Sequence, residues 1–198
     1  MMGAYEEDVE EIDYNQPLEV DTKILNDFSE DDLSHTSVLK DFQTFLSYIS
    51  EKNGMKLTKA NSFIMRRDLL ALNEVMSEPE KLKKTVNQPG SKTMRLFYNM
   101  GRTLNLFIVN SKNTLKITPR MEIFNKLSPR GQFAILFDAM WNKTRWQKFL
   151  SPDSGGRPEW AQEERTEIAY ALSDCEAGKN IHIEIGLRGF TWKTAMMN

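Results

Sequence analysis

The hydrophobic and polar positions of residues 36–58 predict a helix followed by a very short strand. Thr36 or Ser37 can cap the helix, and the apolar residues that follow recur at the spacing of one helical face up to Ile49. Gly54 can adopt the left-handed conformation in which many helices end. The next four residues, Met-Lys-Leu-Thr, are typical of an extended segment.

A second helix is predicted from about residue 65 to residue 76, with its leucines inward and Pro79 marking its end. Arg66 and Arg67 fall in its first turn. The helix macrodipole disfavours positive charge there by roughly a few tenths of a kcal/mol. A phosphate contact would favour this placement, although solvent tolerates it equally well.

A third helix is predicted over residues 92–103, because a Pro-Gly pair breaks the chain and Ser91 is a favourable N-cap. Residues at i, i+3, i+4 and i+7 share one face of a helix. The inward stripe chosen in this way comprises Met94, Phe97, Tyr98 and Gly101. The outward stripe, which is polar and largely basic, comprises Lys92, Arg95, Asn99 and Arg102.

A β-hairpin is predicted after this helix, from Leu-Asn-Leu-Phe-Ile-Val at 104–109 and Thr-Leu-Lys-Ile-Thr at 114–118. Helix, strand, helix, helix and hairpin follow one another in the order of a winged helix. In that fold the third helix enters the major groove, where Arg and Asn can contact base edges, and the hairpin wing lies on the backbone. Lys112 would then sit at the wing tip and Lys116 on the returning strand, both near phosphates.

Two further helical pieces are predicted after the hairpin. Residues 119–127 form a short one, and Ser128-Pro129 provides an N-cap and a first-turn proline for the next. Its predicted core stripe comprises Phe133, Leu136, Phe137, Met140 and Trp141.

The residue pattern in the last part of the chain predicts a helix and one strand. Residues 151–160 are rich in Ser, Pro and Gly and mark a boundary, and a helical period follows. Residues 181–187 alternate between apolar and polar positions, which is typical of a strand. Its partner stays open: the strand at 55–58, the hairpin, or a second domain that the chain does not complete.

The predicted fold class is mainly α with a small β component, α+β, as a winged helix with extra C-terminal helices and a short strand. Residues 1–35 are predicted to be an acidic, disordered arm. Residues 36–150 form the winged-helix-like domain with its C-terminal helices. Residues 151–198 are predicted to be a packed extension or the start of an incomplete second domain.

Charge is strongly segregated along the chain, although the net charge is only −2. Residues 1–35 hold 12 acidic residues and one basic residue, whereas residues 36–150 hold 20 basic and 8 acidic residues. Such a basic block indicates a polyanionic partner, or an acidic arm that folds over the basic surface. A solvated surface of mixed charge is the alternative.

Candidate chemistry is sparse. The nucleotide-binding, metalloprotease and hydrolase-elbow motifs are all missing from the sequence, and the two histidines, His35 and His182, lie far apart. Cys175, the single cysteine, is predicted to be a core residue. We therefore expect no enzyme activity, no catalytic residue, no metal, no cofactor and no small-molecule substrate. The sequence has no apolar run typical of a leader peptide or of a membrane-spanning helix, which predicts a soluble, cytoplasmic protein that does not associate with a membrane.

Three segments carry a resemblance: "LKDFQTFLSYISEK", "LTKANSFIMRRDLLALNEVMSEP" and "LSPRGQFAILFDAMW". In this order they resemble the module of a group of uncharacterised prokaryotic proteins, in some of which it precedes a domain of unknown function named after a plasmid reading frame. The element order is also similar to winged-helix regions attached to helicases. The resemblance covers about residues 36–150 and implies no reaction, cofactor or catalytic residue.

The leading functional hypothesis is a non-enzymatic winged-helix module that binds duplex DNA through the third helix and the wing. Its predicted nucleic-acid contacts are Lys92, Arg95, Asn99, Arg102, Lys112, Lys116, Arg66 and Arg67. The alternative is a protein-interaction or dimerisation module, with a homodimer or another protein as partner. A third hypothesis makes the acidic arm an internal competitor for the basic face.

Overall fold

The computed structural model describes residues 13–19, 29, 33, 36–148, 162–173, 181–186 and 189–194. The chain forms two compact units, Met1–Thr144 and Arg145–Asn198. Most of the predicted acidic arm, together with His35, Cys175 and the boundary segment 151–160, lies outside the described residues. The first unit contains every residue predicted to contact nucleic acid, so its architecture decides where those residues lie.

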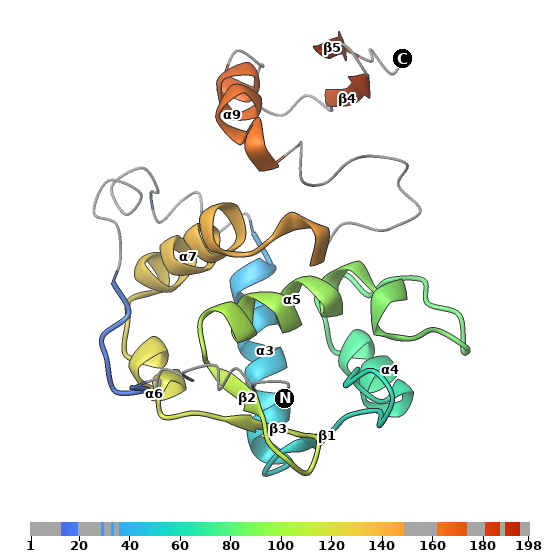
Figure 1. Cartoon of the computed structure of the whole chain (residues 1–198), viewed down its shortest axis with the longest axis vertical. Helices are drawn as coiled ribbons and strands as arrows, with labels where there is room; N and C mark the ends of the chain where they lie inside the picture. Colours follow the sequence, from blue (N-terminus) through green and yellow to red (C-terminus); the bar gives the residue numbers. More distant parts are fainter. Residues whose placement is uncertain are drawn as a thin grey trace, which may run out of the picture. The chain divides into compact units, whose positions relative to one another are not determined.

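The elements of the first unit follow one another in the predicted order (Figure 1). They are α3 (Val38–Glu51), β1 (Met55–Lys56), α4 (Arg66–Glu74), the 3-10 turn η1 (Gln88–Gly90), α5 (Lys92–Thr103), β2 (Phe107–Val109), β3 (Thr114–Ile117), α6 (Arg120–Asn125), α7 (Pro129–Asp138) and the π-helical turn η2 (Ala139–Lys143). The N-caps predicted at Ser91 and Ser128 are confirmed, because the hydroxyl of Ser91 accepts from the backbone N–H of Met94 and that of Ser128 from Gly131. Ser37 is the N-cap residue of α3, but its side chain makes no capping hydrogen bond.

Three short strands form one antiparallel sheet in the order β1-β3-β2. Met55 of β1 faces Leu115 of β3, and Phe107 of β2 faces Ile117. The central strand is therefore the returning strand of the predicted hairpin. Helices and a small antiparallel sheet together confirm the α+β class.

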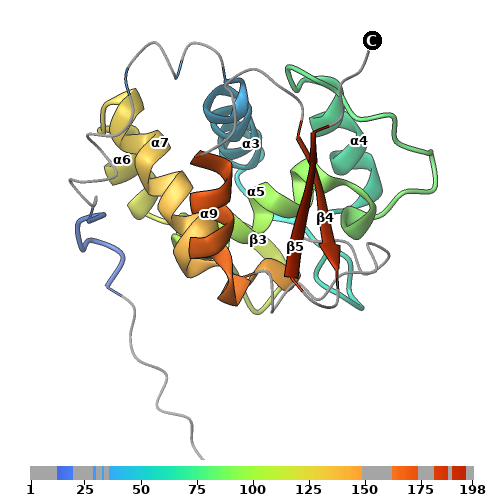
Figure 2. The same cartoon turned by 90° about the horizontal axis from the view of Figure 1, so that it is seen from above.

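The helices of the first unit surround α3 and α5. Figures 1 and 2, which view the molecule from two directions, show α4 on one side of this pair and α6 and α7 on the other. The hairpin of β2 and β3 lies against α3, and β1 extends it on the side of β3. As a result α3 contributes to the core along its whole length.

Aromatic side chains fill the centre of the first unit. The rings of Phe42 and Phe45 on α3 both meet Phe97 on α5, with centroids 5.4 Å and 6.0 Å apart. Phe45 also packs on Phe107 of β2, and Phe42 on Phe124 of α6. All five rings are at most 2% exposed. Burying them supplies several kcal/mol of stabilisation, at roughly 1.5–3 kcal/mol for each large apolar side chain.

Buried polar side chains tie the loops to this core. The carboxylate of Asp41 on α3 accepts from the backbone N–H and the hydroxyl of Ser77. Asp68 on α4 accepts from the hydroxyl of Tyr48 and, at 2.6 Å, from the ammonium of Lys52. Each buried carboxylate therefore has the partners that its desolvation requires.

The core stripe predicted for α7 is only partly right. Leu136 is buried, but Phe133, Phe137, Met140 and Trp141 are only partly buried. The inward positions belong instead to Ile135, Leu136 and Ala139, which are 0–3% exposed. This set has the same helical spacing, and its small Ala139 allows a closer approach of the chain to the core.

The second unit contains a 3-10 turn, a helix and a β-hairpin. Its described elements are η3 (Trp146–Lys148), α9 (Arg165–Ser173), β4 (Ile181–Gly186) and β5 (Gly189–Thr194). The strand predicted at 181–187 was expected to pair with 55–58, to pair with the earlier hairpin, or to open a second domain that the chain does not complete. It pairs instead with β5, antiparallel from Ile181 opposite Thr194 to Gly186 opposite Gly189. The glycines and the short connection favour this local hairpin.

We expect Gly101→Ala to destabilise the protein although alanine is the better helix former. A Cβ built at Gly101 would lie 2.1 Å from a ring carbon of Phe107, a core side chain that has no room to move. Overpacking of this kind costs roughly 1–3 kcal/mol, more than the ~1 kcal/mol gained in helix propensity. Thermal or urea unfolding measures the difference.

Gly131→Ala is the matched control on α7. A Cβ there meets its nearest atoms at 3.4 and 3.5 Å, an ordinary contact. This variant is expected to be as stable as the wild type or up to about 1 kcal/mol more stable. Equal effects of the two substitutions would contradict the close contact between α5 and β2.

Candidate nucleic-acid interface

The inward face of α5 decides which of its residues reach the surface. Met94, Phe97 and Gly101 are buried as predicted, whereas Tyr98 is only partly buried. The hydroxyl of Tyr98 donates to the carbonyl of Ser62, 3.3 Å away, in the turn between β1 and α4. Lys92 and Arg102 are exposed at the two ends of the helix. These two cations are available for contacts with a partner.

The N-terminus of α5 is already occupied by a carboxylate of the chain itself. One oxygen of Glu80 accepts from the backbone N–H of Thr93 at 2.7 Å and from the hydroxyl of Ser91, and the other accepts from the N–H of Lys92. Asn73 holds Glu80 in place through reciprocal side-chain to backbone bonds of 2.9 Å. A phosphate therefore cannot use these helix-end amides without displacing Glu80.

Burial alone would raise the pKa of Glu80, but the hydrogen bonds from Thr93, Ser91 and Lys92 outweigh it and hold the pKa below its usual range. The carboxylate also sits at the positive end of the α5 dipole. Sequence patterns did not reveal this cap, because Met94 stands where a local capping box would place a glutamate.

Arg95 was predicted to face outward as a base-reading residue, and this is wrong. Arg95 is only 8% exposed, and its Nε is buried without a hydrogen-bond partner in the part of the chain that the structure describes. Burial lowers the pKa of Arg95, and the nearby Glu80 carboxylate partly opposes this. Helical periodicity places Arg95 on the polar stripe of α5, but it does not show which positions of that stripe neighbouring segments cover.

Asn99 and Arg102 differ in what they can offer a partner. The amide nitrogen of Asn99 donates to the backbone carbonyl of Arg95 at 2.8 Å, so this donor already serves the helix itself. Arg102 is exposed, and it lies close enough to Tyr98 to counteract partly the burial that raises the pKa of the Tyr98 hydroxyl. Of the four residues predicted on this face, Lys92 and Arg102 therefore remain the accessible cations.

The tip of the β2–β3 hairpin is held rigidly by asparagines. Asn110 accepts from the backbone N–H groups of Lys112 and Thr114 through its side-chain oxygen. Asn113, in the left-handed conformation at φ 54°, donates from its side chain to the carbonyl of Thr58 and accepts from the hydroxyl of Ser62. These bonds clamp the hairpin tip to the turn before α4.

The two hairpin lysines have different environments. Lys112 is exposed at the tip, as predicted. Lys116 was predicted to contact phosphate, but its ammonium donates to the backbone carbonyl of Asn53 at 2.7 Å and lies 3.3 Å from the Asn53 side-chain oxygen. It therefore braces the turn after α3, and its contact with phosphate stays a prediction.

Arg66 and Arg67 are both exposed at the start of α4. Arg66 donates to the carbonyl of Val86 at 3.3 Å, which places it beside the loop between α4 and η1. Arg67 is 88% exposed and lies 3.9 Å from Asp68, a weak ion pair. The same loop carries exposed Lys81, Lys83 and Lys84, which the predicted set of contacts left out.

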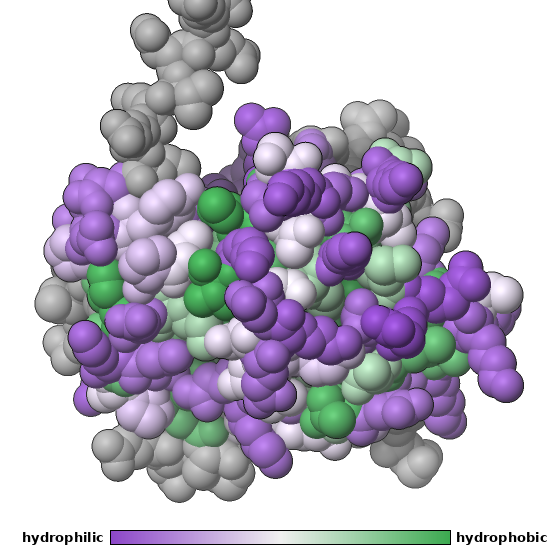
Figure 3. Space-filling model, turned by 90° about the horizontal axis from the view of Figure 1, so that it is seen from below, coloured by the Kyte–Doolittle hydropathy of each residue, from purple (hydrophilic) through white to green (hydrophobic). Residues whose placement is uncertain are grey.

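Hydrophilic side chains cover much of the described surface on the face seen in Figure 3, and the hydrophobic ones form separate spots. Met65 and Val75, at the two ends of α4, are the large apolar residues that the first unit exposes within its described part, at 43% and 57%. Single exposed apolar residues of this kind are ordinary on protein surfaces.

Among the described residues, no group of three or more His, Cys, Asp or Glu side chains is arranged to hold a metal ion. No described helix is long and apolar enough to cross a membrane. Comparisons with protein-family models, with curated proteins and with solved structures found no match. The resemblance of residues 36–150 to an uncharacterised prokaryotic module therefore stays an expectation.

We expect Glu80→Gln to lower the free energy of unfolding by about 1 kcal/mol at neutral pH, because it removes the charge that caps α5. A carboxyl with a lowered folded-state pKa stabilises the fold above its unfolded-state pKa, and this stabilisation is lost as the pH falls through the folded-state pKa. The difference between variant and wild type should therefore shrink in acid, as followed by urea unfolding across pH.

Glu78→Gln removes the same charge from the same loop and is the matched control, because Glu78 is exposed and takes no part in the cap. It should leave stability within about 0.5 kcal/mol of the wild type at all pH values. A Glu80→Gln deficit that stays constant into acid would contradict a charge-dependent cap.

Proposed function

We propose that residues 36–144 form a winged-helix module that binds duplex DNA mainly through its phosphates. The order helix, strand, helix, helix and hairpin supports this, as does the sheet order β1-β3-β2, in which the first short strand pairs with the returning strand of the wing. The proposed contacts come from both ends of α5, from the start of α4 and from the hairpin tip.

The exposed cations carry this proposal. Lys92, Arg102 and Lys112 are exposed, and none of the ion pairs in the described part of the chain includes them. Arg66 and Arg67 add two more charges, and the loop beside Arg66 adds its three lysines. Cations that lack carboxylate partners are free to neutralise phosphates and to release the counterions of DNA.

The proposed binding is largely independent of DNA sequence. Base reading by a recognition helix needs side-chain donors that reach the base edges from its exposed face. On α5 the side chain of Arg95 is buried, and the Asn99 amide donates to the helix backbone. Contacts to phosphates position a protein on the duplex but carry no sequence information directly.

Two arginines on α5 provide the sharpest test. Arg102→Met should weaken the binding of a labelled duplex and reduce the slope of log K against log salt by about one. Arg95→Met removes the same charge from the same helix but should leave that slope almost unchanged, because Arg95 is only 8% exposed and its Nε is buried. Fluorescence anisotropy at several salt concentrations measures both slopes. Equal loss of slope in the two variants would contradict the distinction between them.

Two double variants, each of which removes two lysine charges, provide the second control. Lys92→Gln combined with Lys112→Gln should weaken binding more than Lys40→Gln combined with Lys126→Gln, in which exposed lysines of α3 and of the α6 C-terminus are changed. Both pairs lower the net charge equally, so a difference reports position. Absence of binding by the wild type at about 50 mM salt would overturn the proposed function.

A further inference from the structure

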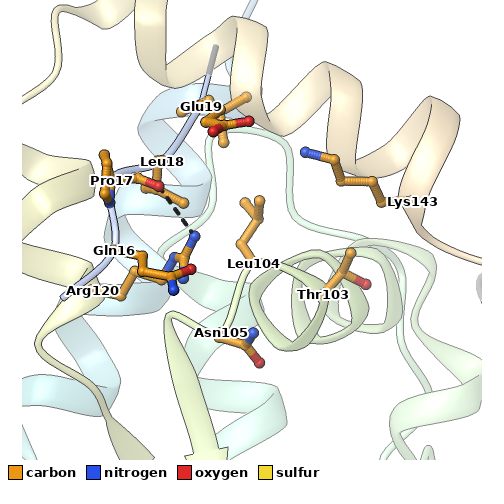
Figure 4. A pocket seen from close by; sticks show the side chains of 10 residues that line it. Gln16, Pro17, Leu18, Glu19, Thr103, Leu104, Asn105, Arg120 and Lys143 are labelled. Atoms are coloured by element: carbon orange, nitrogen blue, oxygen red, sulfur yellow. Dashed lines mark hydrogen bonds between the residues drawn. The ribbon is translucent and has the colours of Figure 1, made fainter. Parts of the chain in front are cut away.

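A pocket of about 520 Å³ lies at the C-terminal end of α5 in the first unit (Figure 4). Its volume falls within the range of small-molecule sites, roughly 300–1,000 Å³. Five parts of the chain line it: the end of α5, the first turn of α6, α7, the π-helical turn η2 and segment 13–19. The lining residues that matter most are Gln16, Leu18, Leu104, Asn105, Arg120 and Lys143.

The guanidinium of Arg120 is the unusual group in this pocket. Its Nε is buried and has no hydrogen-bond partner within the described ranges of the chain. Its Nη2 makes one long bond of 3.5 Å to the backbone carbonyl of Pro17. A buried charged donor without an acceptor is unfavourable, and the flat fork of an arginine is best satisfied by a carboxylate.

Of the two cations that line the pocket, Arg120 is the one that no ion pair within the described residues includes. Lys143 enters from the opposite side in Figure 4, but its ammonium pairs with Asp138 at 2.6 Å. Burial alone would raise the pKa of Asp138, but the hydrogen bonds from Lys143 and Asn142 outweigh it and hold the pKa of this carboxyl below its usual value. Glu19 also lines the pocket, and its negative charge opposes the entry of multiply charged anions.

The pocket also has an apolar wall. Leu18 is 9% exposed and belongs to the hydrophobic core, although it comes from the segment before α3, and Leu104 and Ile135 are 5% and 3% exposed. Figure 4 shows the Leu104 side chain between the Arg120 and Lys143 sides. An inorganic ion would leave this wall unused, whereas the apolar part of an organic anion would bury against it.

We propose that this pocket binds a small organic acid that has one carboxylate and an apolar body. The carboxylate accepts hydrogen bonds from the terminal nitrogens of the Arg120 guanidinium, next to the buried Nε, and the apolar body packs against Leu18 and Leu104. The polar side chains of Gln16 and Asn105 flank the site. This proposal does not depend on DNA binding, because none of its residues belongs to the proposed nucleic-acid surface.

Benzoate is the probe, and the side-chain Nε–H signals of arginine in ¹H–¹⁵N NMR spectra of the full chain are the readout. A buried Nε–H exchanges slowly with water, so Arg120 and Arg95 should both give signals. Benzoate is expected to shift the Arg120 signal in a saturable manner and to leave the Arg95 signal in place. Arg95 therefore serves as an internal control for ionic strength.

Variants assign the effect to the proposed contacts. Arg120→Lys keeps the charge but removes the fork and the Nε–H signal, and it should weaken benzoate binding by about tenfold. Lys126→Gln, which removes an exposed charge at the end of the same helix α6, should bind benzoate as the wild type does. Retained affinity in Arg120→Lys, measured by backbone amide shifts around Leu104, would overturn the proposal.

Inorganic phosphate at matched ionic strength separates an organic-acid site from general attraction of anions. The proposal predicts that phosphate shifts the Arg120 signal far less than benzoate, because phosphate cannot use the apolar wall and is opposed by Glu19. An equal response to phosphate, or an Arg120 signal that responds to neither compound, would overturn the proposal.

Discussion

The contact between Gly101 and the ring of Phe107 sets the position of α5, and the rest of the first unit depends on it. The absence of a side chain at Gly101 lets the α5 backbone approach β2 more closely than any Cβ would permit. Phe97, one turn earlier, then meets Phe42 of α3 at 5.4 Å. With these contacts fixed, the rotation of α5 about its axis is fixed as well. Lys92 and Arg102 therefore reach the surface. Tyr98 contacts the turn before α4, and the hairpin tip is held beside the same turn.

Much of this architecture could be predicted from the sequence, because its signals are local. Ser91 and Ser128 cap their helices through their own hydroxyls, and the element order followed from periodicity and from turn residues. The stripe of α7 could not be chosen in the same way. Ile135 and Ala139 have the same spacing as the aromatic positions, and only packing against α3 and α5 decides between them. The larger side chains favoured the aromatic set in the sequence, but a close interface favours the set with the smaller side chains.

The candidate site was less predictable, because exposure and pairing depend on groups distant in sequence. Arg95 has the helical phase of a surface residue but is buried, and periodicity describes only the direction of a side chain. Lys116 is taken up by Asn53, which lies 63 residues earlier, and the α5 cap comes from Glu80 in the preceding loop. Surface positions such as Lys92 and Lys112 were predicted well, since they need only the absence of a neighbour.

The proposed acid pocket and the proposed DNA surface both involve α5, and the packing of this helix limits the coupling between them. The C-terminal end lines the pocket through Leu104 and Asn105, while Lys92 and Arg102 are exposed at the two ends of the helix. A ligand alters a distant contact only as far as its affinity differs between two arrangements of the helix. A second arrangement of α5 would have to move Gly101 away from Phe107, and close-packed interiors resist such shifts. An acid bound at Arg120 would therefore stabilise the fold by mass action while leaving the proposed DNA binding through Lys92 and Arg102 nearly unchanged.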